Sequence, residues 1–312
     1  MKDTQKQPEN SIFSRLSAPT PATASGGAFS LASVLPTLLL IVVSVALVGI
    51  GVLDEAFQET DAWLYITLCI TPVAFGVTAF AYLRYRKIPV RVAVCSQACS
   101  WRYYVLAVCL QIGLFALAEL NGLFLAWLER FGYQPQEIQL PELRGFGIVG
   151  VLFVVAVLPA VAEELIFRGI LLDGLKKNFP SWAAVLLCGG IFAVYHQRPE
   201  QTIYQFCCGA GYALLTLRAG SVLPTVLAHF LNNALIIILH ANGITALSIP
   251  VFIAVVSVAA VCLTGTLVYL IRVDKTQPQR QSPVDKKGFF VWAALGLVVI
   301  VCGWITGLVS GL

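Results

Sequence analysis

Charged residues are scarce in this chain. Asp, Glu, Lys and Arg make up only 12% of the 312 residues, about half of the roughly 25% that is usual in a soluble protein. Hydrophobic residues make up 58%, and no polar stretch is long enough to form a soluble domain. The formal net charge of +4 comes from short segments between apolar runs, so it does not indicate a nucleic-acid partner. The composition excludes a soluble protein and predicts a membrane protein.

Several common motifs are also missing. The sequence has no internal repeat, no P-loop and no dinucleotide-binding glycine fingerprint. Its nine cysteines lack the C-x-x-C spacing of a zinc or redox site. We therefore expect these cysteines to be small packing residues within apolar runs, and no redox compartment follows from them.

Apolar runs of about 20 residues dominate the rest of the chain. A helix rises about 1.5 Å per residue, so a run of this length crosses a hydrocarbon core about 30 Å thick. We expect an all-α, polytopic transmembrane helix bundle of eight or nine spans, with the spans near 33–53, 62–83, 103–127, 146–172, 181–196, 202–217, 222–240, 247–271 and 288–308. Residues 1–30 are predicted to be a disordered tail, and residues 31–312 a single integral membrane domain.

The basic residues predict an orientation in the membrane. Cytoplasmic loops collect Lys and Arg, and a cytoplasmic N-terminus places 16 of the 20 basic residues inside: Lys2, Lys6, Arg15, Arg84, Arg86, Lys87, Arg91, Arg102, Lys176, Lys177, Arg218, Arg272, Lys275, Arg280, Lys286 and Lys287. The outer loops keep Arg130, Arg144 and Arg198, and Arg168 lies within a span. We expect a multi-pass protein of the bacterial inner or plasma membrane with its N-terminus in the cytoplasm.

Three ionisable residues interrupt the fourth span. A charge near a helix centre costs roughly 2.5–3.5 kcal/mol on insertion scales, so Glu163, Glu164 and Arg168 need compensating interactions. Glu164 and Arg168 are four residues apart and share a helical face, so they can form an ion pair. Glu163 is rotated about 100° away. This asymmetry predicts a structural role for Glu164 and a chemical role for Glu163.

His196 is the predicted partner of Glu163. Residues 178–180 have the sequence of a turn, with Glu163 15 residues before the turn and His196 15 residues after Ser181. In an antiparallel hairpin the two side chains would lie at a similar depth. Gly189 and Gly190 would let the two helices of the hairpin approach closely.

A second polar pair lies in the seventh span. His229 and Asn233 are four residues apart on one helical face, whereas the adjacent Asn232 points elsewhere. A carboxylate and imidazole that polarise water, opposite an imidazole and an amide that donate hydrogen bonds to an oxyanion, are sufficient for amide hydrolysis.

These motifs resemble those of the CPBP intramembrane proteases, a family that includes type II CAAX prenyl endopeptidases and bacteriocin-processing or self-immunity homologues. The family pattern E-E-x-x-x-R, F-x-x-x-H and H-x-x-x-N corresponds here to Glu163-Glu164-x-x-x-Arg168, Phe192-x-x-x-His196 and His229-x-x-x-Asn233. The resemblance covers residues 146–240, which we take as the catalytic core.

The resemblance implies a role for each motif residue. Glu163 would be the general base, His196 its partner on the water, and His229 and Asn233 the oxyanion side, with Glu164, Arg168 and Phe192 in support. Glu163, His196 and His229 could instead share a zinc ion. No cofactor is favoured, because an amide such as Asn233 is a poor zinc ligand.

The predicted function is an intramembrane endopeptidase acting near the terminus of a membrane-associated peptide or lipidated, CAAX-like protein within the bilayer. A proton-coupled transporter is the first alternative, since intramembrane ionisable residues also form proton relays. A catalytically silent immunity or adaptor protein with the same fold is the second. Among the other polar residues, Glu119 and Asn121 are expected to face a cavity or the bundle interior, and His240 the membrane interface.

Overall fold

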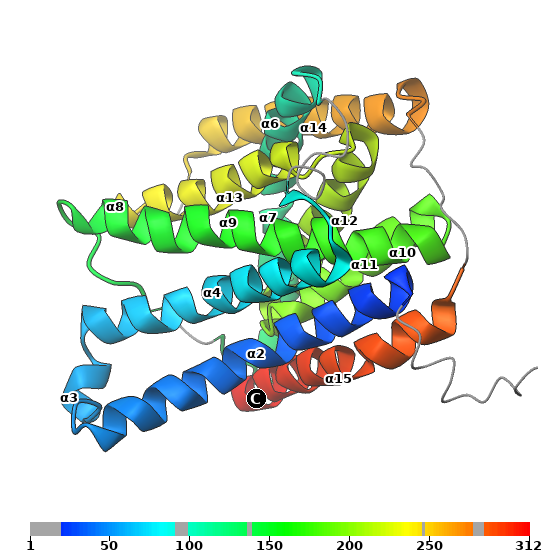
Figure 1. The fold of residues 1–312 in the computed structure, drawn as a ribbon. Coiled ribbons are helices and arrows are strands. Elements are labelled where there is room, and N and C mark those ends of the chain that lie inside the picture. The colour runs from blue at the N-terminus through cyan, green and yellow to red at the C-terminus, as the bar shows by residue number, and fades with distance from the viewer. Residues whose placement is uncertain (1–19, 91–98, 136–138, 245–246, 277–283) are drawn as a thin grey trace, which may run out of the picture.

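The computed structural model describes residues 20–90, 99–135, 139–244, 247–276 and 284–312, and throughout these ranges the chain forms helices and no strands (Figure 1). In chain order the helices are α2 (Pro21–Gly49), α3 (Glu55–Gln58), α4 (Asp61–Arg86), α6 (Arg102–Phe115), α7 (Ala118–Glu129), α8 (Gly147–Val151), η1 (Leu152–Val157), α9 (Leu158–Glu164), η2 (Leu165–Leu171), α10 (Leu172–Asn178), α11 (Ser181–Tyr195), η3 (Pro199–Gln201), α12 (Thr202–Ala219), α13 (Leu223–Ala241), α14 (Ile249–Val268), η4 (Tyr269–Val273) and α15 (Lys286–Gly311).

Seven helical segments of the described chain are long and apolar enough to cross a membrane: α2, α4, α6 with α7, α8 to α10, α13, α14 with η4, and α15. The all-α transmembrane bundle is therefore confirmed, and the expected count of eight or nine spans is approximate. The remaining two predicted spans are α11 and α12. Helix α11 has 15 residues, or about 22 Å of length, which is shorter than the hydrocarbon core.

The boundary predicted for the N-terminal tail is wrong, because residues 21–30 are helical and begin α2. Thr20 caps this helix by accepting a hydrogen bond from the Thr23 N–H at 3.2 Å. The Ser25 hydroxyl donates to the Pro21 carbonyl at 2.9 Å. Polar side chains that bond to the backbone in this way are compatible with a helix despite their composition. Residues 1–19 lie outside the described residues.

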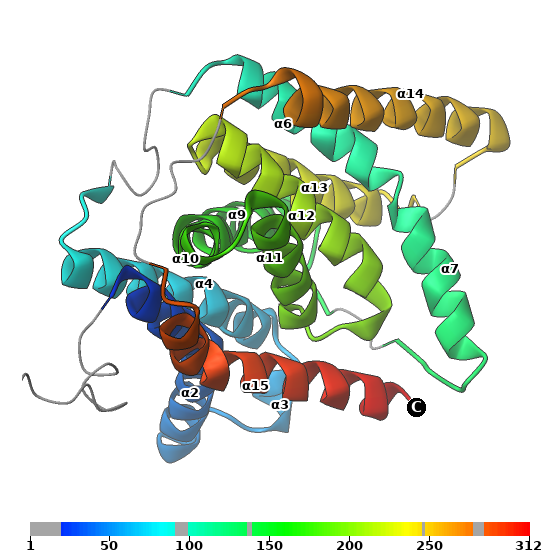
Figure 2. The ribbon, with the colours of Figure 1, turned by 90° about the vertical axis from the view of Figure 1, so that its right-hand side faces the viewer.

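The helix that carries the two glutamates lies at the centre of the bundle. Figure 2 looks along α9 and α10, which are surrounded by α4, α11, α12 and α13. Helices α2 and α15 pack side by side below it. Ser30 joins these two, since its hydroxyl donates to the Trp292 carbonyl at 2.6 Å and accepts from the Gly296 N–H at 3.0 Å.

Two π-helical segments, η1 and η2, flank the short helix α9. Such segments are rare and occur frequently at functional sites. Pro159 gives a reason for the irregularity on the η1 side, because it has no N–H to donate to the carbonyl of Val155, four residues earlier. The Asn233 side chain on α13 donates to that carbonyl at 2.9 Å. The local break in the helix is thus repaired by a neighbouring helix.

Aromatic rings fill the core next to the site. Phe167 on η2 lies at the centre of this cluster, with ring centroids of Phe29 at 6.5 Å, Phe75 at 6.1 Å, Phe192 at 5.0 Å and Tyr195 at 5.2 Å. These rings come from α2, α4 and α11. The cluster therefore fixes η2, directly after the glutamates, against three other helices.

The predicted hairpin is present, since α10 ends at Asn178 and α11 begins at Ser181. The expected role of the glycines is wrong. A Cβ at Gly189 would lie 2.9 Å from the backbone nitrogen of Ala210, and one at Gly190 would meet nothing within 4 Å. Gly189 therefore allows α11 to approach α12 rather than the glutamate helix.

Candidate active site

The ion pair predicted between Glu164 and Arg168 is confirmed. Arg168 Nη1 lies 2.8 Å from Glu164 Oε1, and both side chains are fully buried. A second guanidinium nitrogen of Arg168, Nη2, donates to the Gly209 carbonyl at 3.3 Å. The guanidinium carbon also lies 4.3 Å from the ring centroid of Phe192 and 5.2 Å from that of Tyr212. Arg168 thus ties η2 to α11 and α12.

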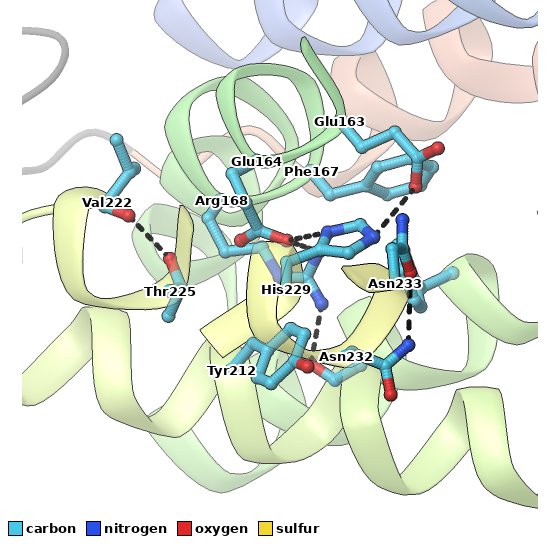
Figure 3. Close-up of polar contacts among 12 residues, drawn as sticks. Glu163, Glu164, Phe167, Arg168, Tyr212, Val222, Thr225, His229, Asn232 and Asn233 are labelled. Atoms are coloured by element: carbon cyan, nitrogen blue, oxygen red, sulfur yellow. Dashed lines mark hydrogen bonds and ion pairs between the residues drawn. The ribbon is translucent and has the colours of Figure 1, made fainter. Parts of the chain in front are cut away.

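Glu164 has a second partner that its sequence position does not reveal. Its Oε1 atom lies 3.0 Å from Nδ1 of His229 on α13 (Figure 3). A carboxylate accepts hydrogen bonds, so Nδ1 of His229 carries the hydrogen. This interaction orients the ring, and Nε2 of His229 faces Glu163 at 4.0 Å.

Glu163 meets both histidines, as the hairpin geometry predicts for His196. Its Oε2 atom lies 4.0 Å from His196 Nε2 and 4.0 Å from His229 Nε2. This oxygen is buried and has no hydrogen-bond partner among the described residues. Buried carboxylate oxygens are normally satisfied. Oε2 of Glu164 is unpaired as well, and Glu163 differs in having two imidazole nitrogens at 4.0 Å, a spacing that a bridging water or substrate group would fill.

The F-x-x-x-H spacing has a clear structural basis. His196 is the C-cap of α11, and its Nδ1 atom lies 2.8 Å from the carbonyl of Phe192, one turn earlier. Since a carbonyl only accepts, Nδ1 donates and Nε2 is left to face Glu163. The Phe192 ring packs on the imidazole, with ring centroids 4.6 Å apart. Phe192 therefore sets both the direction and the rotation of the His196 ring.

Asn233 lies one turn after His229 and is held at both ends of its amide. Its Nδ2 atom donates to the Val155 carbonyl at 2.9 Å, and its Oδ1 atom accepts from Asn232 Nδ2 at 3.0 Å. The amide bridges α13 and η1. One of the two N–H groups of Nδ2 is used in this contact, and the other remains available as a donor.

A buried polar network behind Asn233 escaped the sequence analysis. Asn232, expected to point away, accepts hydrogen bonds from Gln111 Nε2 at 2.8 Å and from the Tyr204 hydroxyl at 2.5 Å. Tyr212 in turn donates to Gln111 Oε1. Gln111 could have been found from the sequence. A polar amide within the apolar run of α6 needs a hydrogen-bond partner, as a buried charge does.

Three other polar residues lie outside this cluster. Glu119 is exposed at the start of α7, so the expectation that it faces the interior is wrong. Asn121 accepts a hydrogen bond from the backbone N–H of Tyr204 at 2.9 Å, which joins α7 to α12. His240 is exposed near the end of α13.

The cluster does not match a zinc site. Tetrahedral zinc bound at about 2.0–2.1 Å keeps neighbouring ligand atoms about 3.4 Å apart, whereas Glu163 Oε2 lies 4.0 Å from each imidazole Nε2. Within the described ranges, no group of three His, Cys, Asp or Glu side chains is placed to hold a metal ion.

Fold and site together define an all-α integral membrane protein with a buried cluster of carboxylates and imidazoles. A protein-family model described as type II CAAX prenyl endopeptidase Rce1-like matches residues 145–235. This confirms the resemblance over a segment that contains all seven motif residues, and it supports a CAAX-type intramembrane protease in general terms. Helices α2 to α7, α14 and α15 lie outside the matched segment. No curated protein and no solved structure matches the chain.

Proposed function

We propose that the protein is an intramembrane endopeptidase that hydrolyses peptide bonds with a water activated by Glu163. The observation that carries the proposal is the buried, unpaired Oε2 atom of Glu163 at 4.0 Å from two imidazole nitrogens. This distance is too long for a direct hydrogen bond. It suits a water molecule that bonds to the carboxylate and an imidazole at about 2.8 Å each.

Glu163 and His196 act on the water. The neutral His196 ring, with its hydrogen on Nδ1, accepts one hydrogen bond from the water at Nε2 and orients it. Glu163 removes the other proton as the water oxygen attacks the peptide carbonyl, and a tetrahedral oxyanion forms. When the C–N bond breaks, Glu163 returns this proton to the departing amine.

His229 and Asn233 stabilise the oxyanion. Glu164 fixes Nδ1 of His229 and so turns Nε2 toward the site, where a hydrogen on Nε2 would be donated to the oxyanion, and Asn233 offers its second N–H. Fixed donors in a water-poor site stabilise developing charge strongly. Arg168 holds Glu164 in place for this task. In this proposal Glu163, His196, His229 and Asn233 are the catalytic residues of a core spanning residues 146–240.

The substrate we propose is a membrane-associated peptide or lipidated, CAAX-like protein that is cut near one terminus. A helical substrate hides its carbonyls in its own hydrogen bonds, so the site accepts an extended segment, which is most readily supplied by a chain end. An attached acyl or prenyl chain concentrates the substrate in the bilayer, with about 0.8 kcal/mol for each buried CH₂ group. We place the protein in a bacterial inner or plasma membrane.

The test is cleavage of one fluorogenic peptide, with and without a C-terminal lipid, in proteoliposomes. We expect the wild type to cleave the lipidated peptide faster, and His229→Ala to lose at least about a hundredfold in rate, the usual effect of removing an oxyanion donor. His240→Gln is the matched control, because this histidine lies on the same helix outside the cluster. Wild-type rates in the His229 variant, or efficient cutting of a folded soluble protein in mid-chain, would contradict the proposal.

A further inference from the structure

The segment that follows His196 has an unusual backbone. Gln197 adopts a φ of 54°, the left-handed region that residues other than glycine seldom occupy. Its N–H donates to the Val194 carbonyl at 3.1 Å. Gln197 directly follows the C-cap residue of α11, the position at which helices commonly end in this conformation, most often with glycine. Gln197 is the immediate neighbour of a proposed catalytic residue.

Helix α15 supplies the surroundings that hold Gln197. A Cβ at Gly303 would lie 2.6 Å from Gln197 Oε1 and 2.8 Å from its Nε2. A Cβ at Gly307 would meet the Gln197 carbonyl oxygen, and it would lie 3.3 Å from Cδ of Pro199. Gly303 and Gly307 are four residues apart on one face, the spacing that allows close approach in membrane helices. At Gly307 the obstructing atom is a backbone oxygen, so only a hydrogen atom fits there. At Gly303 the obstructing atoms belong to the side-chain amide of the exposed Gln197, which would have to move.

Further contacts keep this face of α15 against the same segment. Trp304 Nε1 donates to the Thr202 hydroxyl at 2.9 Å. Tyr133, which packs on Gly311, donates to Glu200 Oε2 at 2.6 Å. Burial and the hydrogen bond to Glu200 raise the pKa of Tyr133 to about 12, so it stays a donor at physiological pH. The segment therefore contacts α15 at Gln197, Pro199 and Thr202, and it is linked to the end of α15 through Tyr133.

On the basis of the proposed function, we infer that α15 positions His196 for catalysis by holding Gln197 in its left-handed conformation. Gln197, Gly303 and Gly307 are positioning residues in this arrangement and do not contact the reacting atoms. Helix α15 lies outside the segment that matches the family model. A helix distant in the chain thus completes the site.

The experiment compares variants on both sides of this contact in proteoliposomes. Gly303→Ala places a methyl group against the Gln197 amide, and Gln197→Val disfavours the left-handed backbone without changing α15. We expect both to lower kcat by roughly tenfold to a hundredfold, since a displacement of about 1 Å has effects of this size. KM and Tm should stay near wild-type values. The double variant Gly303→Ala/Gln197→Gly removes the obstructing amide and should recover kcat to within about threefold.

Gly265→Ala on α14 is the matched control, because a Cβ there meets nothing within 4 Å. Unchanged kcat in Gly303→Ala and Gln197→Val would overturn the inference. So would a loss that the double variant does not restore, because general destabilisation would then explain it.

A second measurement does not depend on peptidase activity. The chain has three histidines, so ¹⁵N-histidine labelling gives three imidazole environments, with the exposed His240 as an internal reference. We expect Gly303→Ala to shift the His196 signal and the double variant to restore it. If the wild type cleaves no peptide but this pattern holds, the proposed function fails and the positioning role stands. An unchanged His196 signal in Gly303→Ala would refute the positioning role.

Discussion

At the residue scale, two adjacent glutamates have different surroundings. Glu164 is fully buried, and its Oε1 atom lies 2.8 Å from Arg168 and 3.0 Å from His229, while its Oε2 atom is unpaired. Glu163 has no such close partner, and its unpaired Oε2 atom lies 4.0 Å from two imidazole nitrogens. The 100° rotation between neighbouring helical residues places one carboxylate against fixed partners and leaves the other for chemistry. Replacing Glu163 or Glu164 by glutamine should therefore affect activity and stability differently.

Glu163→Gln should abolish proteolysis while leaving the protein as stable as the wild type. The amide keeps the shape of the side chain but cannot accept the proton, and loss of a general base lowers rates by about 10²–10⁴-fold. Glu164→Gln should lose both activity and stability, by about 3–5 kcal/mol, because Arg168 is left as a buried charge without its counter-ion. Thermal unfolding in detergent, combined with peptide cleavage, measures both effects. Equal Tm values for the two variants would contradict the division.

At the element scale, the glutamate helix depends on an irregularity and its repair. Pro159 cannot donate to Val155, and Asn233 donates to that carbonyl from α13. A residue with a backbone N–H at position 159 would make the helix more regular. Its N–H would compete with the Asn233 side chain for the Val155 carbonyl. The two glutamates end the short regular helix α9, directly before the π-helical segment η2.

Pro159→Ala should lower kcat several-fold while leaving Tm unchanged or higher. An alanine N–H competes with Asn233 for the Val155 carbonyl, and an internal proline costs a helix about 3 kcal/mol. Pro36→Ala is the control, because Pro36 also lies inside a membrane-length helix, α2, but far from the cluster in sequence and outside the matched segment. The control should keep wild-type kcat. A faster Pro159 variant would mean that the irregularity does not serve catalysis.

At the scale of the whole molecule, the orientation in the membrane follows from helix order and charge. Helices α11 and α12 form a hairpin. Whether this hairpin spans the membrane or enters it only part way, its two ends lie on the same side, so it does not change the side on which the C-terminus lies. With seven helical segments long and apolar enough to span, we propose that the start of α2 and the end of α15 lie on opposite sides. We propose that the N-terminus is cytoplasmic, since Lys and Arg favour that side.

Cysteine-accessibility labelling in a cysteine-free background measures this orientation. Glu55→Cys, in the exposed helix α3, should react only from outside, and Arg84→Cys, exposed near the end of α4, only from the cytoplasm. A membrane-impermeant maleimide applied to intact cells and to inverted vesicles separates the two sides. Labelling of position 55 from the cytoplasmic face alone would reverse the orientation of the site.

The sequence by itself determined the membrane class and the local partners. A chain with little charge and long apolar runs is stable in a bilayer as a set of helices, because each helix satisfies the hydrogen bonds of its own backbone. Helical periodicity was enough to pair Glu164 with Arg168. The equal distances of Glu163 and His196 from the hairpin turn were enough to predict that these two lie close together. These relations depend on short separations along the chain, for which helix geometry is a reliable guide.

Only the tertiary structure decided which atoms face Glu163. The contact of His229 with Glu164, the contact of Asn233 with Val155 and the network through Gln111 join helices far apart in the chain. Each depends on the rotation of one helix about its axis relative to another, which close packing sets and local periodicity does not encode. The same holds for the close approach of α15 to Gln197, whereas the left-handed backbone of Gln197 is common for a residue that follows a helix C-cap.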